Sequence, residues 1–121
     1  MAKIKDISAR QILDSRGAWT VEATLTLSSG VSAAASVPCG KSTGAHEAVA
    51  LSASAAVRSI HTVIKPLLAL YDFRDQAALD AFLNKLDGTP AKKKLGANAI
   101  LAVSIAFLRA TAKAKHAPLW K

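Results

Sequence analysis

The sequence predicts an α+β domain in which a three-stranded antiparallel meander is followed by a helical segment packed on one face. Three observations predict this fold. The first third of the chain alternates apolar and polar residues between turns, the remainder repeats apolar residues at helical spacing, and no repeat or low-complexity linker separates the two parts. With 121 residues, the chain is long enough for one hydrophobic core, and we expect a single domain over residues 1–121.

Two hairpins account for the three expected strands. The first strand is expected over residues 4–13, where β-branched and apolar residues are interrupted by polar ones. Residues 14–17 have the composition of a turn, and the alternation over 20–27 predicts a second strand with one covered face. After a second turn at 28–30, the third strand is expected over 31–37. Such a meander can pack one face on helices and leave the other in water.

Apolar residues at helical spacing follow the strands and predict a first helix with one apolar stripe. Pro66 lies inside it and should start, kink or divide a helix, because proline has no backbone N–H and clashes with the preceding turn. The stripe consists of Val57, Ile60, Ile64 and Leu67 or Leu68.

Two further helices are expected. The first is short and amphipathic, with Asp75 as its N-cap and Gly88 at its end. The second, over 97–115, is apolar on nearly all sides except at Ser104, Arg109 and its final turns, and is therefore expected in the middle of the domain. The stripe of the short helix is formed by Leu79, Phe82, Leu83 and Leu86.

Charge and composition limit the classes of function that this chain can have. The net charge of +8 and the pI near 10.0 are compatible with binding to a polyanion. They are also compatible with a solvated surface, because the only dense run is at 92–94 and the last cations gather at a helix end, where they complement the helix dipole. No apolar run is long enough to cross a bilayer and the N-terminus lacks the apolar core of a signal peptide, so we expect a cytoplasmic protein without a membrane partner. Cys39 is the only cysteine, so no internal disulfide is possible.

The segment from Pro38 to Gly44 is the strongest candidate for chemistry. Its glycines, Lys41 and two hydroxyls could cradle an anion with backbone N–H groups and a cation. It is not a Walker loop, because the glycine required five residues before Gly40 is Ala35.

The histidines beyond this segment are weaker candidates. The adjacent His46-Glu47 pair could perform acid–base work or could belong to a solvated loop. His61 lies on a helical stripe, where a place at the edge of the core is favoured over a ligand role. No complete catalytic set is present.

Four segments in the same order resemble the N-terminal domain of the enolase family. They are Ala9 to Gly17 (ARQILDSRG), Thr20-Val21-Glu22, Val37 to Gly44 with His46-Glu47-Ala48, and Leu86-Asp87-Gly88-Thr89 continuing into Leu95 to Ser104 (LGANAILAVS). The resemblance spans essentially the entire chain, down to Pro118-Leu119-Trp120, which is similar to the junction where the family enters its barrel domain.

The resemblance implies a glycolytic lyase that dehydrates 2-phosphoglycerate to phosphoenolpyruvate with two magnesium ions. In such an enzyme a lysine acts as the base, a glutamate assists departure of hydroxide, and acidic groups hold the first metal. All of these belong to the C-terminal barrel domain, beyond Lys121. The resemblance therefore implies that these 121 residues hold no catalytic residue and are inactive alone. They would require the barrel in cis or in trans.

The same resemblance assigns roles to residues of this chain. Ser42 matches the serine that ligates the second magnesium, which makes it the one metal ligand expected here. Arg10 and Glu22 match residues that form ion pairs between the subunits of a homodimer, although they could also be an ordinary exposed pair. The lid that closes over the substrate comprises Gly40, Lys41, Ser42, Thr43 and Gly44, with His46 at its end.

The chain departs from the family pattern in several ways. Ala18-Trp19 replaces the usual Asn-Pro, and the acidic segment that normally follows Glu47 is replaced by a short stretch rich in alanine and serine. The chain is also more basic than is typical of the family. These departures leave a second hypothesis, in which the domain is a repurposed, non-catalytic module that binds nucleic acid or another polyanion.

Overall fold

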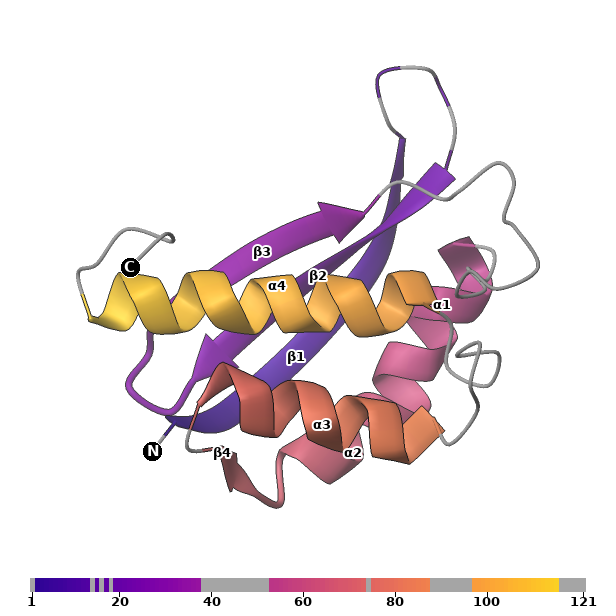
Figure 1. The fold of residues 1–121 in the computed structure, drawn as a ribbon. Helices are drawn as coiled ribbons and strands as arrows, with labels where there is room; N and C mark the ends of the chain where they lie inside the picture. The colour runs from indigo at the N-terminus through magenta and orange to yellow at the C-terminus, as the bar shows by residue number, and fades with distance from the viewer. Residues whose placement is uncertain are drawn as a thin grey trace.

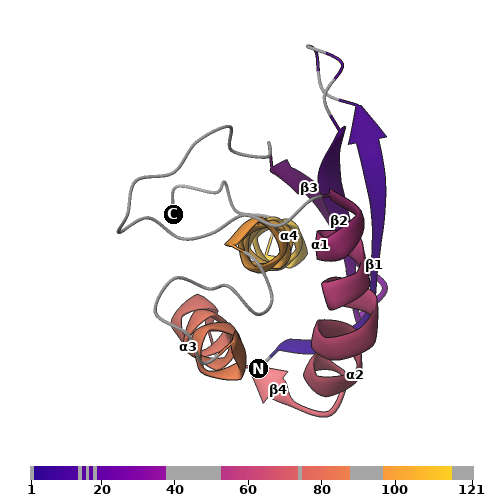
Figure 2. The same ribbon diagram turned by 90° about the vertical axis from the view of Figure 1, so that its right-hand side faces the viewer.

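A computed structural model of the chain describes residues 2–13, 15, 17, 19–37, 53–73, 75–87 and 97–115. Within them, a twisted antiparallel sheet has its helices on one face (Figures 1 and 2), which confirms the predicted α+β class. The strands are β1 (Ala2–Leu13), β2 (Trp19–Leu27), β3 (Ser32–Val37) and β4 (Asp72–Phe73), in the order β3-β2-β1-β4.

The hairpin turns follow from their glycines. Gly17 and Gly30 have φ of +77° and +97°, a backbone conformation that glycine adopts without steric cost. At the second turn, the Gly30 N–H donates to the Leu27 carbonyl at 2.9 Å, and the Leu27 N–H donates to Val31 at 2.8 Å. This is the pattern of a short hairpin loop that ends in a left-handed glycine.

The fourth strand was not predicted. Only two residue pairs join it to β1, Ala2 with Phe73 and Lys3 with Asp72. A two-residue strand is too short to show an alternation in the sequence. Phe73 is nevertheless buried, and its ring meets those of Phe82 and Phe107 edge to face at 5.5 and 6.3 Å between centroids.

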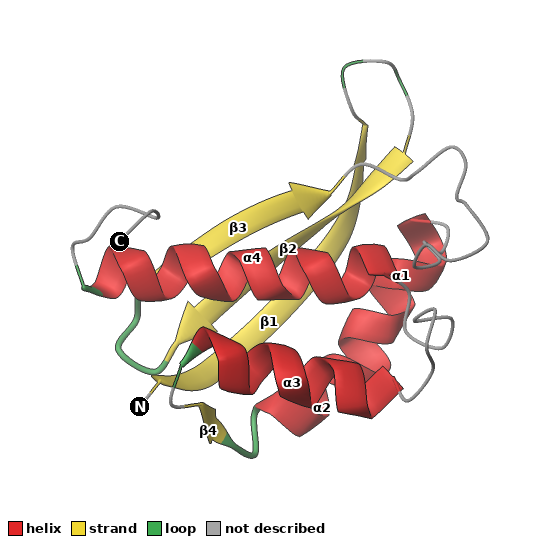
Figure 3. Cartoon of the chain, in the orientation of Figure 1, coloured by secondary structure: helices red, strands yellow, loops and turns green. Residues whose placement is uncertain are grey.

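A continuous helical run follows the predicted lid and contains Pro66. It consists of α1 (Ala53–Ser59), a π-helical segment η1 (Ile60–Ile64) and α2 (Lys65–Leu68), as the cartoon in Figure 3 shows. At the end of the π-helical segment the Lys65 N–H donates to the Ile60 carbonyl, five residues back, and Pro66 follows in the first turn of α2. Of the outcomes expected at Pro66, the structure shows the start of a helical segment, since Pro66 lies in the first turn of α2. The wider π-helical turns immediately precede this residue, which has no N–H to donate.

The last two helices are α3 (Gln76–Asp87) and α4 (Ala97–Ala114). Asp75 caps α3 as predicted, since its Oδ1 accepts the Ala78 N–H at 2.9 Å. Helix α4 packs across β2 and β3 and buries Phe107, but Leu101 and Leu108 on its other side are exposed. The expectation that this helix is surrounded by the core is therefore wrong on that side.

One hydrophobic core joins the sheet to the helices. It includes Leu25 from β2, Ile60 and Ile64 from the π-helical segment, Leu83 from α3 and Phe107 from α4. The helix-facing side chains of β2 from Val21 to Leu27 are almost completely buried, whereas Glu22, Thr24 and Thr26 on its opposite face are half-buried. The core thus occupies a single layer between the sheet and the helices.

Candidate functional site

The predicted lid lies outside the described residues, but its two flanks are described. Gly40, Lys41, Ser42, Thr43, Gly44 and His46 all fall in the undescribed range 38–52. Before this range, Val37 ends β3, and after it Ala53 begins α1.

Both flanks are fixed in the core. The Val37 side chain is buried, and its carbonyl accepts a hydrogen bond from the buried Thr20 hydroxyl of β2. On the other side, Ala56 and Ile60 are completely buried against the sheet. The described chain on either side of residues 38–52 is therefore packed in the core.

The β1–β2 hairpin projects at the same end of the sheet. Figure 1 shows the end of β1 and the start of β2 extending beyond the end of β3. Leu13 and Trp19 are partners in the register at the base of the tip, and each is 56% exposed. Two large apolar side chains side by side in water are typical of a surface that packs against another protein part. Asp14, Arg16 and Ala18 are outside the described residues.

Arg10 and Glu22 form an ion pair within the chain. They are direct partners in the β1–β2 register, and the Arg10 Nε donates to the Glu22 Oε1 at 2.8 Å. Both side chains lie on the sheet face that the helices leave open, with 73% of Arg10 and 22% of Glu22 exposed. A cross-strand pair of this exposure stabilises the fold by about 0–1 kcal/mol.

His61 has a structural role that the sequence did not reveal. Its Nε2 accepts a hydrogen bond of 2.9 Å from the Ala9 N–H of β1, so the imidazole joins the π-helical segment to the sheet. The expected place at the edge of the core is not observed, because His61 is exposed. No helical or alternating pattern distinguishes such an acceptor from any other histidine.

A second ion pair joins the same helical run to β1. The Lys65 Nζ lies 2.9 Å from the Asp6 Oδ1. The hydrogen bond from Lys65 lowers the pKa of the Asp6 carboxyl below its usual value, against a smaller opposing effect of burial.

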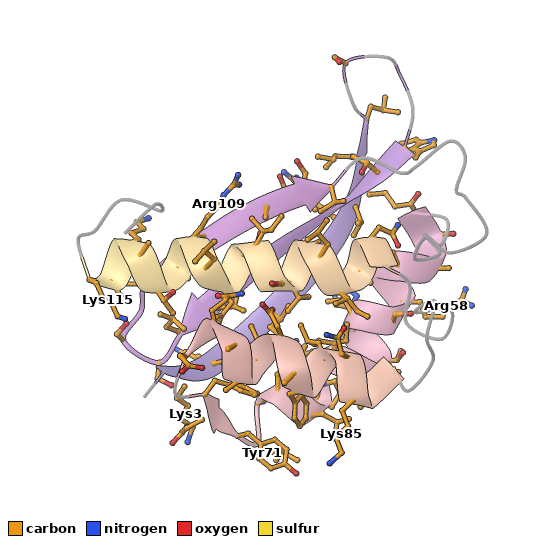
Figure 4. The ribbon with its side chains drawn as sticks, viewed as in Figure 1. Lys3, Arg58, Tyr71, Lys85, Arg109 and Lys115 are labelled. Atoms are coloured by element: carbon orange, nitrogen blue, oxygen red, sulfur yellow. The ribbon has the colours of Figure 1, made fainter. Side chains whose placement is uncertain are left out.

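Several of the described cations lie apart from one another. In Figure 4, Lys3, Arg58, Lys85, Arg109 and Lys115 lie at separate positions around the molecule. The described residues also contain no group of three or more His, Cys, Asp or Glu side chains arranged for a metal ion, and Ser42 is outside them. None of the described helices is both long and apolar enough to span a membrane.

Comparison with known proteins decides the family. The enolase N-terminal domain profile matches residues 4–121. An enolase of Solanum lycopersicum is 47% identical, in an alignment that covers 100% of this chain. The chain belongs to the enolase family.

The match corresponds to one part of the relative. This enolase N-terminal domain spans 31% of the tomato protein's length. The alignment extends over 137 positions, more than the chain's 121 residues, so the relative has residues without a counterpart here.

Proposed function

We propose that this chain is the lid and dimerisation domain of an enolase, the cytoplasmic glycolytic lyase that converts 2-phosphoglycerate to phosphoenolpyruvate. The observation that carries the proposal is the family match over residues 4–121, together with 47% identity to an enolase along the whole chain. The match covers the lid sequence from Gly40 to Gly44 and the Arg10 and Glu22 positions.

In this proposal the lid completes the active site. Its glycines allow a close backbone approach to the substrate phosphate, and Lys41 adds a positive charge. The Ser42 hydroxyl is a hard oxygen donor of the kind that magnesium prefers. In the complete enzyme, magnesium supplies positive charge that stabilises the ene-diolate. Closure of residues 40–44, with His46 moving at their end, excludes water from the reacting groups.

The barrel domain supplies the remaining chemistry. The lysine base, the glutamate acid and the carboxylates of the first metal site belong to it, in cis or in trans. The exposed Leu13 and Trp19 at the hairpin tip support a docking surface for the barrel at this end of the sheet. The 121 residues alone are then inactive.

The dimer role of Arg10 and Glu22 is supported by their position. Both lie on the open face of the sheet, where a second subunit has access. Because their mutual pair contributes only about 0–1 kcal/mol, exchanging it for ion pairs across a subunit interface costs little.

A Ser42→Ala substitution tests the metal-ligand assignment in an enzyme reconstituted with an enolase barrel domain. We expect turnover to fall on the order of 10²-fold, since a group that positions charge at the reaction centre is lost. Ser29→Ala is the matched control, because Ser29 is exposed in the turn at the opposite end of β2. Equal turnover in the two variants, with both folded, would rule out the role of Ser42.

A further inference from the structure

Two cations of α4 lie at the outer edge of β3. β3 is the terminal strand of the sheet, with β2 on one side and no described strand on the other. Two of its outward carbonyls accept hydrogen bonds from α4. The Arg109 Nη1 donates to Ala34 at 2.9 Å, and the Lys113 Nζ donates to Ser32 at 3.3 Å.

The spacing of these cations matches the repeat of a strand. Arg109 and Lys113 are one helical turn apart, or about 6 Å, and α4 lies along β3 in Figures 1 and 4. Ser32 and Ala34 are two residues apart in a strand, or about 6.7 Å. Arg109 and Lys113 therefore bind consecutive outward-facing carbonyls of the same strand edge.

The edge also carries backbone donors. In an antiparallel strand the N–H and C=O of one residue point to the same side, so the row with the Ser32 and Ala34 carbonyls includes their N–H groups and continues at Ser36. No described residue accepts a hydrogen bond from the outward N–H of Ala34 or Ser36. These groups are free to pair with an added strand as far as the described chain is concerned.

The side chains of β3 offer no obstacle to such pairing. The strand reads SAAASV, without a charged, bulky or proline residue, and Ala34 and Ser36 are exposed. Edge strands are usually protected by charges of their own, by proline or by bulges. Here the only charges at the described edge are the two cations of α4, and their partners are neutral carbonyls. A carboxylate is a stronger partner for either cation.

We propose that the β3 edge binds an extended acidic peptide segment as an added strand, with Asp or Glu at alternate positions facing Arg109 and Lys113. The carboxylates replace the Ala34 and Ser32 carbonyls as partners of the two cations. The released carbonyls, with the outward N–H groups, then form the ladder with the peptide. The acidic character of the occupant follows from charge complementarity, both with this cation pair and with the net charge of +8.

The test uses the 121-residue chain and a short peptide in which Glu alternates with Thr and Val. We expect saturable binding that weakens with salt, and slower hydrogen exchange at the amides of Ala34 and Ser36. The same peptide, N-methylated on the backbone groups that would face β3, keeps its charge but cannot form the ladder. Equal binding of both peptides, or no binding of the first, would overturn the proposal.

Two double variants separate the cation pair from net charge. Arg109→Ala with Lys113→Ala should weaken binding about tenfold. Arg58→Ala with Lys85→Ala removes the same charge at exposed sites away from β3, and should leave binding within about twofold. An exchange of the pair, Arg109→Lys with Lys113→Arg, should retain binding. Equal loss in the two alanine variants, with unchanged circular dichroism, would contradict the proposal.

Discussion

The two faces of the sheet differ in what they contribute. On the helix side of β2, Val21, Ala23 and Leu25 are completely buried and form the floor of the core. On the other side, Glu22 and Thr24 are only half-buried, and Glu22 pairs with Arg10 from the neighbouring strand. The first face therefore accounts for folding. Substitutions on the second face should cost little stability, and its side chains are accessible to another protein surface.

The largest contrast is expected between Leu25→Ala and Thr24→Ala, at adjacent positions on opposite faces. Leu25→Ala removes a fully buried side chain and should lower the free energy of unfolding by about 2–5 kcal/mol. Thr24→Ala should change it by less than about 0.5 kcal/mol. Urea unfolding of both variants measures the difference, and similar losses would mean that the open face also stabilises the fold.

Thr20 differs from the other β2 side chains that face away from the helices, because it is buried. Its hydroxyl is buried and donates to the Val37 carbonyl beside the predicted lid. Thr20→Val keeps the shape but leaves that carbonyl without this donor, so we expect a loss of about 1–3 kcal/mol. Thr24→Val is the matched control and should be close to neutral. A neutral Thr20→Val would show that the hydroxyl does not anchor β3.

A smaller effect on the free energy of unfolding is expected for the Arg10–Glu22 pair. A double-mutant cycle with Arg10→Ala and Glu22→Ala should give a coupling free energy of about 0–1 kcal/mol in the 121-residue chain. Added salt should reduce it. A coupling above about 2 kcal/mol would contradict the argument that the pair can be exchanged at low cost for contacts across an interface.

The smallest effect is expected at the border of the two faces, where Asp6 meets Lys65. The pKa of Asp6 is lowered in the folded chain, so the pair stabilises the fold above the unfolded pKa of about 3.9. This contribution is lost as pH falls through the lower, folded pKa. Lys65→Met should make the unfolding free energy less dependent on pH below about pH 4. An unchanged pH profile in that variant would rule out the ion pair as the cause.

The main elements of the fold could be predicted because each has a local signal. The strands follow from alternation, the α3 cap from Asp75, and the interruption before α2 from Pro66. The exposed side of α4 could not be predicted, since Leu101 and Leu108 have the same composition as a buried face. Which apolar side of a helix is covered depends on tertiary packing.

The candidate site was predicted only through its local motif. The glycines and Ser42 indicate an anion-competent loop, and the ordered family segments predict the lid role of residues 40–44, which lie outside the described residues. The Thr20 bond to Val37, the His61 bond to Ala9 and the α4 cations on β3 join residues that are far apart in sequence. Such contacts leave no periodic signal in one sequence, because they depend on how the elements pack.

We propose that these 121 residues supply a lid and an interface but no catalytic group. The most direct measurement is phosphoenolpyruvate formation from 2-phosphoglycerate and magnesium, followed by the ultraviolet absorbance of the product, with the chain alone and then with an enolase barrel domain. We expect no turnover by the chain alone and turnover that requires both parts. Turnover at an enzyme-like rate by the chain alone would contradict it.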